Sequence, residues 1–397
     1  MSPDWEKIRE TEFPALSKAV YLKAAGGSPM CRSAYLSAKA YLDEMLRDGD
    51  LHYKRYMGEL DDLRALIAEY VGASPDEIAF TVNASSGAIV AAEMLRRAGV
   101  ETVFHPRLDF PATIHAIRNA GFRTVALGAP RGGAWIEKLG RKTPGQGVKG
   151  AKGGKSAVVG AHVCFLNGET LNIAKAAALC RRNKMLLAIN ATQSFGALRI
   201  DVRDGIDMMF ASGLKWACAG YGSGFVFIRK TLIEEYGLPP LTGWLSVKDP
   251  YRMDPENTRP LPRVASLDTG GGFPPFAGLL ALRGSLRLVK RIGGGDLRRG
   301  VRLIEERVLS LAERLRRGLL GAGLPVMGAD GPAQSGIVSI RDARAPRFHK
   351  GLEKAGILAA LRPDPEDGQP RVLRFAVHYY NNGRDLDAAL STMEAMV

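Results

Sequence analysis

Between residues 64 and 230, short apolar runs of strand length alternate with helical patterns, and this alternation limits the fold more than any other feature of the chain. The run EIAFTV (77–82), for example, is followed by SGAIVAAEMLRRAG (86–99), whose apolar residues recur at helical spacing. Such alternation predicts an α/β fold, with a parallel sheet covered on both faces and ligands at the carboxyl ends of its strands. The same order continues in the segments 102–106, 112–121, 123–128, 157–165, 172–183, 185–190, 206–212 and 224–230.

The pattern changes after residue 230. A passage rich in proline (239–262) leads to a long helical pattern from about 279 to 322. Two strand-like runs follow, at 336–342 and 372–380, and a last helical pattern begins at Gly383. We therefore expect a smaller α+β lobe packed on the larger α/β lobe.

Composition and charge exclude several classes of protein. The 397 residues are 46% hydrophobic and 24% charged, which is typical of a globular chain. The apolar runs are too short to cross a bilayer, and the N-terminus is charged where a secretory signal is apolar, so we expect a cytoplasmic protein. The four cysteines lie far apart and the six histidines show no metal-ligand spacing, so we expect reduced thiols and no metal.

The net charge of +14 favours anionic partners in general. Much of the positive charge lies in RKTPGQGVKGAKGGK (141–155), which predicts a solvated loop. No aromatic residues alternate with these charges for base stacking, so we expect no nucleic-acid partner.

One lysine, Lys215, follows a predicted strand in the sequence FASGLKWACAGYGSG. A lysine kept beside apolar neighbours loses solvation, and its neutral amine can form a Schiff base with an aldehyde. A surface lysine after a strand is the simpler alternative when the residue is taken alone. Nearby strand ends carry further polar residues, and the helix start Ser-Ser-Gly favours an anion such as a phosphate. These strand-end residues are Asn83, Ser85, Ser86, Asn190, Gln193 and Ser212.

The stretches AINATQSFGALRIDV and IDMMFASGLKWACAGYGSGFVFIRK resemble the signature of the class V aminotransferase family of fold-type I enzymes, which use pyridoxal 5'-phosphate (PLP). Similar segments cover most of the chain: YLKAAGGSP, FTVNASSGA, LDFPATIHAIRNAG, AHVCFLNGETLNI, GGFPPFAGLLAL and RFAVHYYNNGRDLDAAL. The resemblance implies a mostly parallel seven-stranded sheet between helices, and a homodimer with active sites at the subunit interface. It also implies an N-terminal arm (1–20) that packs on the small domain, a large PLP-binding domain (21–265) and a small C-terminal domain with a long linking helix (266–397).

The resemblance assigns roles to individual residues. Lys215 would be the lysine of the internal aldimine. Ser85 and the amides of Ala84 and Ser86 would hold the phosphate, with help from Ser212.

Three more residues would complete the site. Phe110 would stack on the pyridine ring, Gln193 would bond the ring oxygen, and Arg374 would clamp the substrate carboxylate with its planar fork. A surface arginine on a strand is the alternative for Arg374. His162 and His378 lie on apolar strands, and we expect both to be hydrogen-bonded packing residues.

The sequence departs from the family at several positions. Asn190 stands where the family usually has the aspartate that keeps the pyridine nitrogen protonated, and an amide provides no such charge. Leu214 replaces the histidine that often precedes the lysine in desulfurases, and Phe273 replaces a threonine that meets the phosphate. No cysteine lies in the loop before Arg374, so the persulfide route of cysteine desulfurases lacks its nucleophile.

The predicted function is that of a PLP-dependent enzyme acting on the α-amino group of an amino acid or a related amine. The DFP and HVCF segments resemble the branch of kynureninase and isopenicillin N epimerase, without defining a substrate. Asn190 favours a lyase or epimerase over a plain aminotransferase. A third alternative is a degenerate PLP fold that serves as a binding protein.

Overall fold

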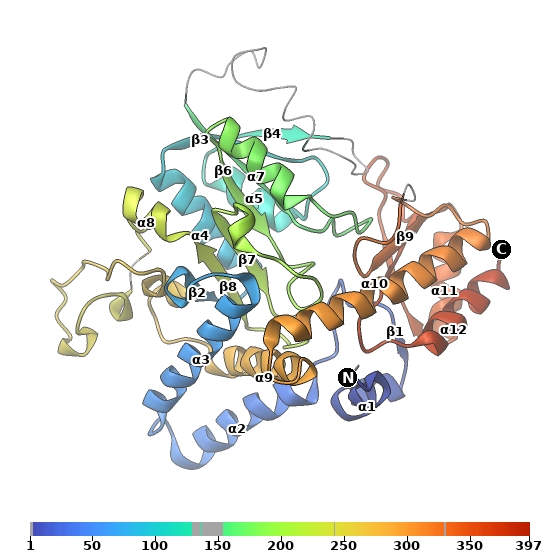
Figure 1. The fold of residues 1–397 in the computed structure, drawn as a ribbon, viewed down its shortest axis with the longest axis horizontal. Helices are drawn as coiled ribbons and strands as arrows, with labels where there is room; N and C mark the ends of the chain where they lie inside the picture. The colour runs from blue at the N-terminus through green and yellow to red at the C-terminus, as the bar shows by residue number, and fades with distance from the viewer. Residues whose placement is uncertain (1–2, 129–135, 137–153, 242, 329–330) are drawn as a thin grey trace.

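The computed structural model describes residues 3–128, 136, 154–241, 243–328 and 331–397 (Figure 1). Its centre is a seven-stranded sheet with the strand order β2-β8-β7-β6-β5-β3-β4. All neighbouring strands are parallel except at β8, which runs antiparallel to both β2 and β7. The predicted mostly parallel seven-stranded sheet is therefore confirmed. The strands are β2 (Ile78–Thr81), β3 (Val100–Pro106), β4 (Arg123–Leu127), β5 (Lys155–Ala161), β6 (Leu186–Asn190), β7 (Met208–Ser212) and β8 (Gly224–Ile228).

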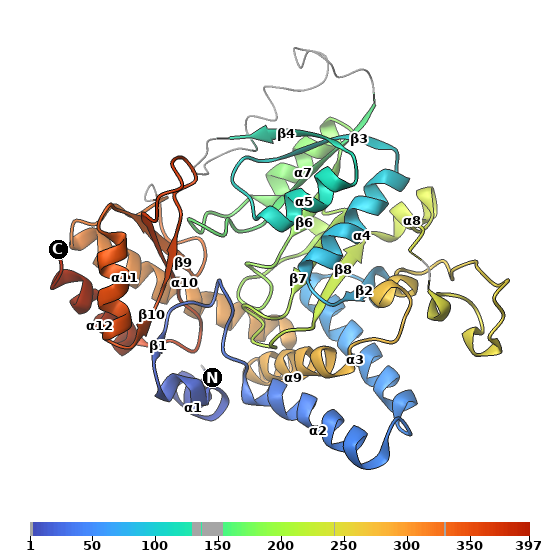
Figure 2. The same ribbon diagram turned by 180° about the vertical axis from the view of Figure 1, so that it is seen from behind.

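Helices cover both faces of this sheet, which explains why its strands are continuously apolar. In β7, Met208 and Phe210 belong to a buried cluster with helices α4 (Ala84–Arg97) and α5 (Pro111–Asn119). The alternate residues Met209 and Ala211 face a second cluster, which includes α3, α7 and α9. Figures 1 and 2 show α7 before one face and α4 and α5 before the other. The bounds of the second group are α3 (Tyr53–Val71), α7 (Ile173–Arg182) and α9 (Phe276–Ile292).

The C-terminal part forms a smaller unit around a three-stranded antiparallel sheet of order β11-β12-β9. Helices α11 and α12 pack on it and share its own buried cluster. The N-terminus also lies here, because β1 (Val20–Tyr21) pairs with β10 and Arg9 of α1 (Trp5–Glu12) forms an ion pair of 2.7 Å with Asp385. The elements are β9 (Ile337–Arg341), α11 (Ala345–Lys354), β10 (Ile357–Leu358), β11 (Ala360–Arg362), β12 (Val372–Ala376) and α12 (Gly383–Glu394).

The single long helix predicted from 279 to 322 is wrong. The structure has two helices, α9 and α10 (Leu297–Gly321), separated by three glycines. Gly294 and Gly295 adopt positive φ angles of 70° and 100°, which L side chains rarely adopt. The first half of α10 packs in the core of the large sheet and the second half packs in the core of the small unit.

The remaining helices are α2 (Arg32–Asp48), which was not predicted, and α8 (Lys230–Tyr236). Among the described ranges, no helix combines the length and the apolar composition needed to cross a bilayer. The cytoplasmic location stays a prediction. Most of the basic segment 141–155 lies outside the described residues, so its predicted solvated loop is not tested.

Candidate active site

Lys215 lies just beyond the carboxyl end of β7, in a turn that begins at Gly213. Its side chain is largely desolvated, and burial lowers the pKa of its amine to about 8, with further lowering by the positive charges of Arg374 and Arg362. The turn is held on both sides, because the Leu214 carbonyl accepts from the amide of Ser28 at 3.2 Å and Trp216 is fully buried. The fold thus holds a partly neutral amine at the edge of the sheet where a ligand is expected.

The Phe110 ring lies beside this amine. The Lys215 Nζ atom is 5.1 Å from the ring centroid, and 43% of Phe110 is exposed. Asp109 fixes the backbone here, since its carboxylate accepts hydrogen bonds from the amides of Phe110 (2.6 Å) and Ala161 (3.0 Å). Burial raises the pKa of Asp109 to about 7. The result is an aromatic face next to the lysine, as ring stacking requires.

Gln193 is buried and bonded at both ends of its amide. It donates from Nε2 to the Ala25 carbonyl at 3.0 Å, and its Oε1 accepts from Trp216 Nε1 at 2.8 Å. An amide nitrogen carries two hydrogens, so one N–H of Gln193 is left for a ring oxygen. The free N–H agrees with the predicted role of Gln193 as a donor to the ring oxygen, and that role stays a prediction.

Asn190 ends β6 and lies directly opposite Ala161 of β5. Its Nδ2 donates to Thr113 Oγ1 at 2.9 Å, and its Oδ1 accepts from the Thr192 amide at 3.0 Å. The Thr192 hydroxyl is buried and has no partner among the described residues. Thr113 was not among the predicted site residues, since only the packing of α5 on the sheet brings it to Asn190.

The start of α4 differs in detail from its predicted role. Asn83 caps the helix, and its Oδ1 accepts from both the amide (3.0 Å) and the hydroxyl (3.1 Å) of Ser86. Ser86 is therefore already engaged, whereas the first-turn amides of Ala84 and Ser85 have no intrahelical partner. Ser212 donates its hydroxyl to the Ser223 carbonyl at 3.3 Å.

Arg374 comes from the other unit of the molecule, on β12. Only 2% of it is exposed, Nη1 donates to the Phe165 carbonyl at 2.5 Å, and Nε has no partner among the described residues. Burial and the charge of Arg362 lower its pKa to about 9. A buried cation without a carboxylate partner is costly, which indicates that an anionic ligand completes the site. The alternative of a surface arginine is wrong.

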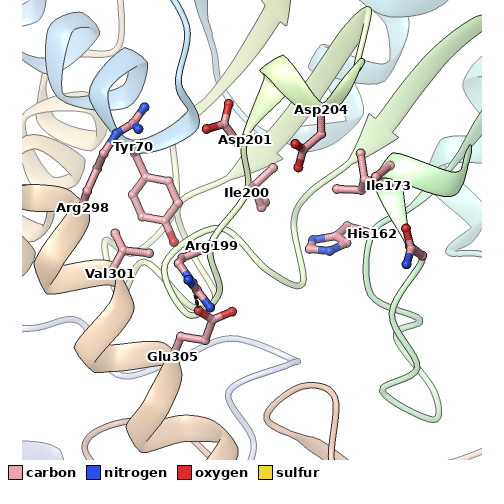
Figure 3. A pocket seen from close by; sticks show the side chains of 12 residues that line it. Tyr70, His162, Ile173, Arg199, Ile200, Asp201, Asp204, Arg298, Val301 and Glu305 are labelled. Carbon is pink, nitrogen blue, oxygen red and sulfur yellow. Dashed lines mark hydrogen bonds and ion pairs between the residues drawn. The ribbon is translucent and has the colours of Figure 1, made fainter. Parts of the chain in front are cut away.

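The two histidines have different environments. His378 is fully bonded, with Nδ1 accepting from the Tyr379 amide and Nε2 donating to the Trp216 carbonyl, each at 2.8 Å. His162 is buried, as expected of a packing residue, but its Nδ1 atom has no hydrogen-bond partner among the described residues, so the expectation of a fully hydrogen-bonded ring is wrong. Its ring lines a cavity of about 480 Å³ with Tyr70, Ile200 and Glu305, and burial lowers its pKa to about 4 (Figure 3). None of the residues predicted to bind PLP or substrate lines this cavity.

The arrangement of a desolvated lysine, an aromatic face and a helix start with free first-turn amides, at the carboxyl edge of a mostly parallel sheet, is typical of the PLP-dependent transferase fold class. Solved structures agree with this fold. The apo cysteine desulfurase of Thermococcus onnurineus superimposes with a TM-score of 0.83 at 18% identity, covering 100% of this chain and 99% of that one. A C-DES variant with glycine covalently linked to its PLP cofactor gives 0.81 at 18% identity, covering 99% of each chain.

The aminotransferase class-V family model matches residues 20–388, and the chain belongs to this family of PLP-dependent enzymes. The uncharacterized aminotransferase YcbU of Bacillus subtilis is 26% identical over 386 residues, which is 96% of either chain. A probable cysteine desulfurase of Pyrococcus abyssi is 23% identical over 350 residues, or 85% of this chain and 83% of the relative.

The side chains present fit PLP. Lys215 offers the amine, Phe110 an exposed ring face, and the start of α4 the free amides for a phosphate. The unpartnered Thr192 hydroxyl lies next to Asn190, at the strand end where the ring is expected.

Proposed function

We propose that this protein is a PLP-dependent enzyme that acts on the α-amino group of an amino acid or a related amine. The observation that carries the proposal is the desolvated amine of Lys215, held beside the Phe110 ring and within the electrostatic reach of Arg374. When bound, PLP supplies an electron-withdrawing ring that stabilises negative charge on the carbon next to the substrate nitrogen.

The residues of the chain supply the remaining steps. Arg374 binds the substrate carboxylate and thereby orients the α-carbon. The amine of Lys215 would accept the proton from that carbon as a general base, and its lowered pKa suits this role near neutral pH. The burial of both side chains excludes water from the reacting atoms.

The test is the visible absorption band of bound PLP. We expect the purified protein to take up PLP and show the band, and Lys215→Ala to lose it. Lys230→Ala is the matched control, because Lys230 is exposed at the start of α8. A wild-type protein that takes up no PLP would refute the proposal, and salt-sensitive nucleic-acid binding without the band would favour the degenerate binding protein.

A lyase or epimerase is the second candidate, and Asn190 favours it. Its neutral amide is fixed by Thr113 and Thr192 and offers no charge to hold a protonated pyridine nitrogen. Product analysis with amino acids, with and without a keto acid, separates the two reactions. Fast amino exchange that depends on the keto acid would show an aminotransferase.

Desulfuration through a persulfide has little support in the site. No cysteine lies in the loop before Arg374, and Cys164 is the cysteine that lies within electrostatic range of Arg374. Burial raises the pKa of the Cys164 thiol to about 11, so the thiol stays protonated at neutral pH and is a poor nucleophile.

We also propose that the protein is a homodimer that closes this site. Large apolar side chains are exposed on α2, on the glycine-rich turn after Lys215 and in the passage before α9. Phe110, at the site itself, is among the exposed residues, so a second subunit that covers these positions would shield the ring face. Further exposed residues on or near these segments include Leu36, Leu46, Leu51, Tyr221, Met253 and Phe273.

A further inference from the structure

Arg362 is a second arginine at the substrate side of the site. It ends β11, whose antiparallel register with β12 pairs Ala360 with Arg374 and Arg362 with Val372. Residues two apart on a strand face the same side of a sheet, so the side chains of Arg362 and Arg374 are diagonal neighbours on one face. The charge of Arg362 acts on both Arg374 and Lys215.

The three cations lack carboxylate partners. Among the described residues, no aspartate or glutamate forms an ion pair with Lys215, Arg362 or Arg374. The hydrogen bond of the Arg362 guanidinium goes from Nη1 to the carbonyl of its neighbour Leu361, at 3.2 Å. A Cβ built on Gly26 would lie 3.9 Å from Arg362 Nη2, in ordinary van der Waals contact, so the Arg362 guanidinium lies beside the loop that contains Gly26.

Other arginines of the same small sheet and its connecting loop do have partners. Arg341 on β9 forms an ion pair with Asp364, and Arg371, just before β12, pairs with Asp367 at 3.1 Å. Asp364 and Asp367 thus pair with arginines outside the site. Arg362 and Arg374, whose charges act on Lys215, therefore remain available to bind an anion from outside the chain.

One substrate carboxylate neutralises only one of these two guanidinium groups. The other would stay charged, and two like charges on one face of a sheet destabilise the sheet. We propose that the substrate is an amino acid with an anionic side chain, whose α-carboxylate is bound by Arg374 and whose second anionic group is bound by Arg362. The inference rests on the proposed function and names the substrate class of the same site. A single carboxylate shared by both arginines is the competing arrangement, and it would demand no charge on the substrate side chain.

Pairs of amino acids with nearly equal shape test this proposal. Aspartate is compared with asparagine and glutamate with glutamine, by the change that each causes in the absorption of the PLP-loaded enzyme. We expect the acidic member of at least one pair to bind about 10- to 100-fold more tightly, because a hydrogen bond between two charged groups contributes that much to the affinity. Equal affinity for the acid and its amide in both pairs would overturn the proposal.

Arg362→Gln is expected to remove this preference, with little change for the neutral amino acids. Arg371→Gln is the matched control, since Arg371 precedes β12 and pairs with Asp367. Arg362→Lys, which keeps the charge, is expected to restore part of the preference. An equal loss for acidic and neutral amino acids in Arg362→Gln would show a structural role and contradict the proposal.

A second readout does not require turnover. Calorimetric titration of the PLP-loaded protein compares succinate, which has two carboxylates and no amine, with butyrate, which has one. We expect succinate to bind more tightly, by an amount that Arg362→Gln removes, and equal binding would refute the two-anion site. If no amino acid changes the absorption of PLP but succinate still binds preferentially, the proposed function fails while the two-anion site stands.

Discussion

Lys215 loses its solvation because it lies in the buried turn after β7, with the Phe110 ring beside its amine. Two guanidinium groups then add repulsion, so the proton leaves more easily. Because the folded pKa lies below the ordinary value of 10.5, the unfolded chain binds this proton more tightly. The contribution of Lys215 to stability therefore rises with pH between about 8 and 10.5 and is lost as the pH falls through about 8.

We predict that PLP attachment to the apoenzyme accelerates with pH and is half-maximal near pH 8, because only the neutral amine of Lys215 adds to an aldehyde. Stopped-flow absorbance over a pH series measures the rate. In Arg374→Met the half-maximal point is expected to move upward, since the variant lacks a positive neighbour. A half-maximal point near 10.5 in the wild type would show that the lysine is not desolvated.

Asn190→Asp is predicted to raise the rate of the transamination half-reaction about 10-fold, because a charged hydrogen bond to the ring nitrogen is roughly twice as strong as a neutral one. Thr113 can donate to the new carboxylate and the Thr192 amide already donates there, so the side chain keeps its place. Single-turnover absorbance measures the rate. An unchanged rate would show that residue 190 does not set the electron demand of the ring.

At the scale of elements, the strands of the large sheet were predicted well because most of them are short apolar runs, and β2, β7 and β8 are buried throughout. The directions of the strands were harder to predict, since nothing in an apolar run distinguishes the antiparallel β8 from its parallel neighbours. The helix α2 was missed although its apolar residues recur at helical spacing; Ala34 alone is buried among its 17 residues.

The residues of the site also divide into those that the sequence could predict and those that it could not. Lys215, Phe110, Gln193 and Arg374 could be found from strand ends and from family motifs. Arg362 depends on the register of two strands separated by a loop, which sequence periodicity does not contain. The missing partner of His162 likewise depends on packing between distant segments.

The contact between α9 and α10 gives a prediction at this scale. A Cβ on Gly300 would lie 2.0 Å from the Val289 carbonyl oxygen of α9, so Gly300→Ala forces the helices apart. We expect the free energy of unfolding to fall by about 1–3 kcal/mol, measured by urea denaturation. Gly321→Ala is the control in the same helix, since no atom lies within 4 Å of its Cβ. That variant is expected to be neutral or stabilised by up to about 1 kcal/mol, and equal losses in both would contradict the steric explanation.

At the scale of the whole molecule, the exposed apolar side chains lead us to expect a dimer. Leu46 is 90% exposed and Tyr221 is 83% exposed, which is costly for a chain that stays monomeric. We predict that light scattering on a sizing column gives twice the chain mass, and that replacing Leu46 and Leu51 by glutamate gives monomers. Leu320→Glu, on α10, is the control. A monomeric wild type would disprove the dimer.

Residues of α1 and the turn after it pack against residues at and just before the start of α12. Phe13 is buried with its ring 4.8 Å from that of Tyr380, and the ion pair of Arg9 with Asp385 spans 376 positions. During translation, Arg9 and Phe13 have no docking partner until Tyr380 and Asp385 have been made. A nascent chain that stops before Tyr380 therefore exposes the Phe13 ring, to which a chaperone that binds aromatic side chains could attach.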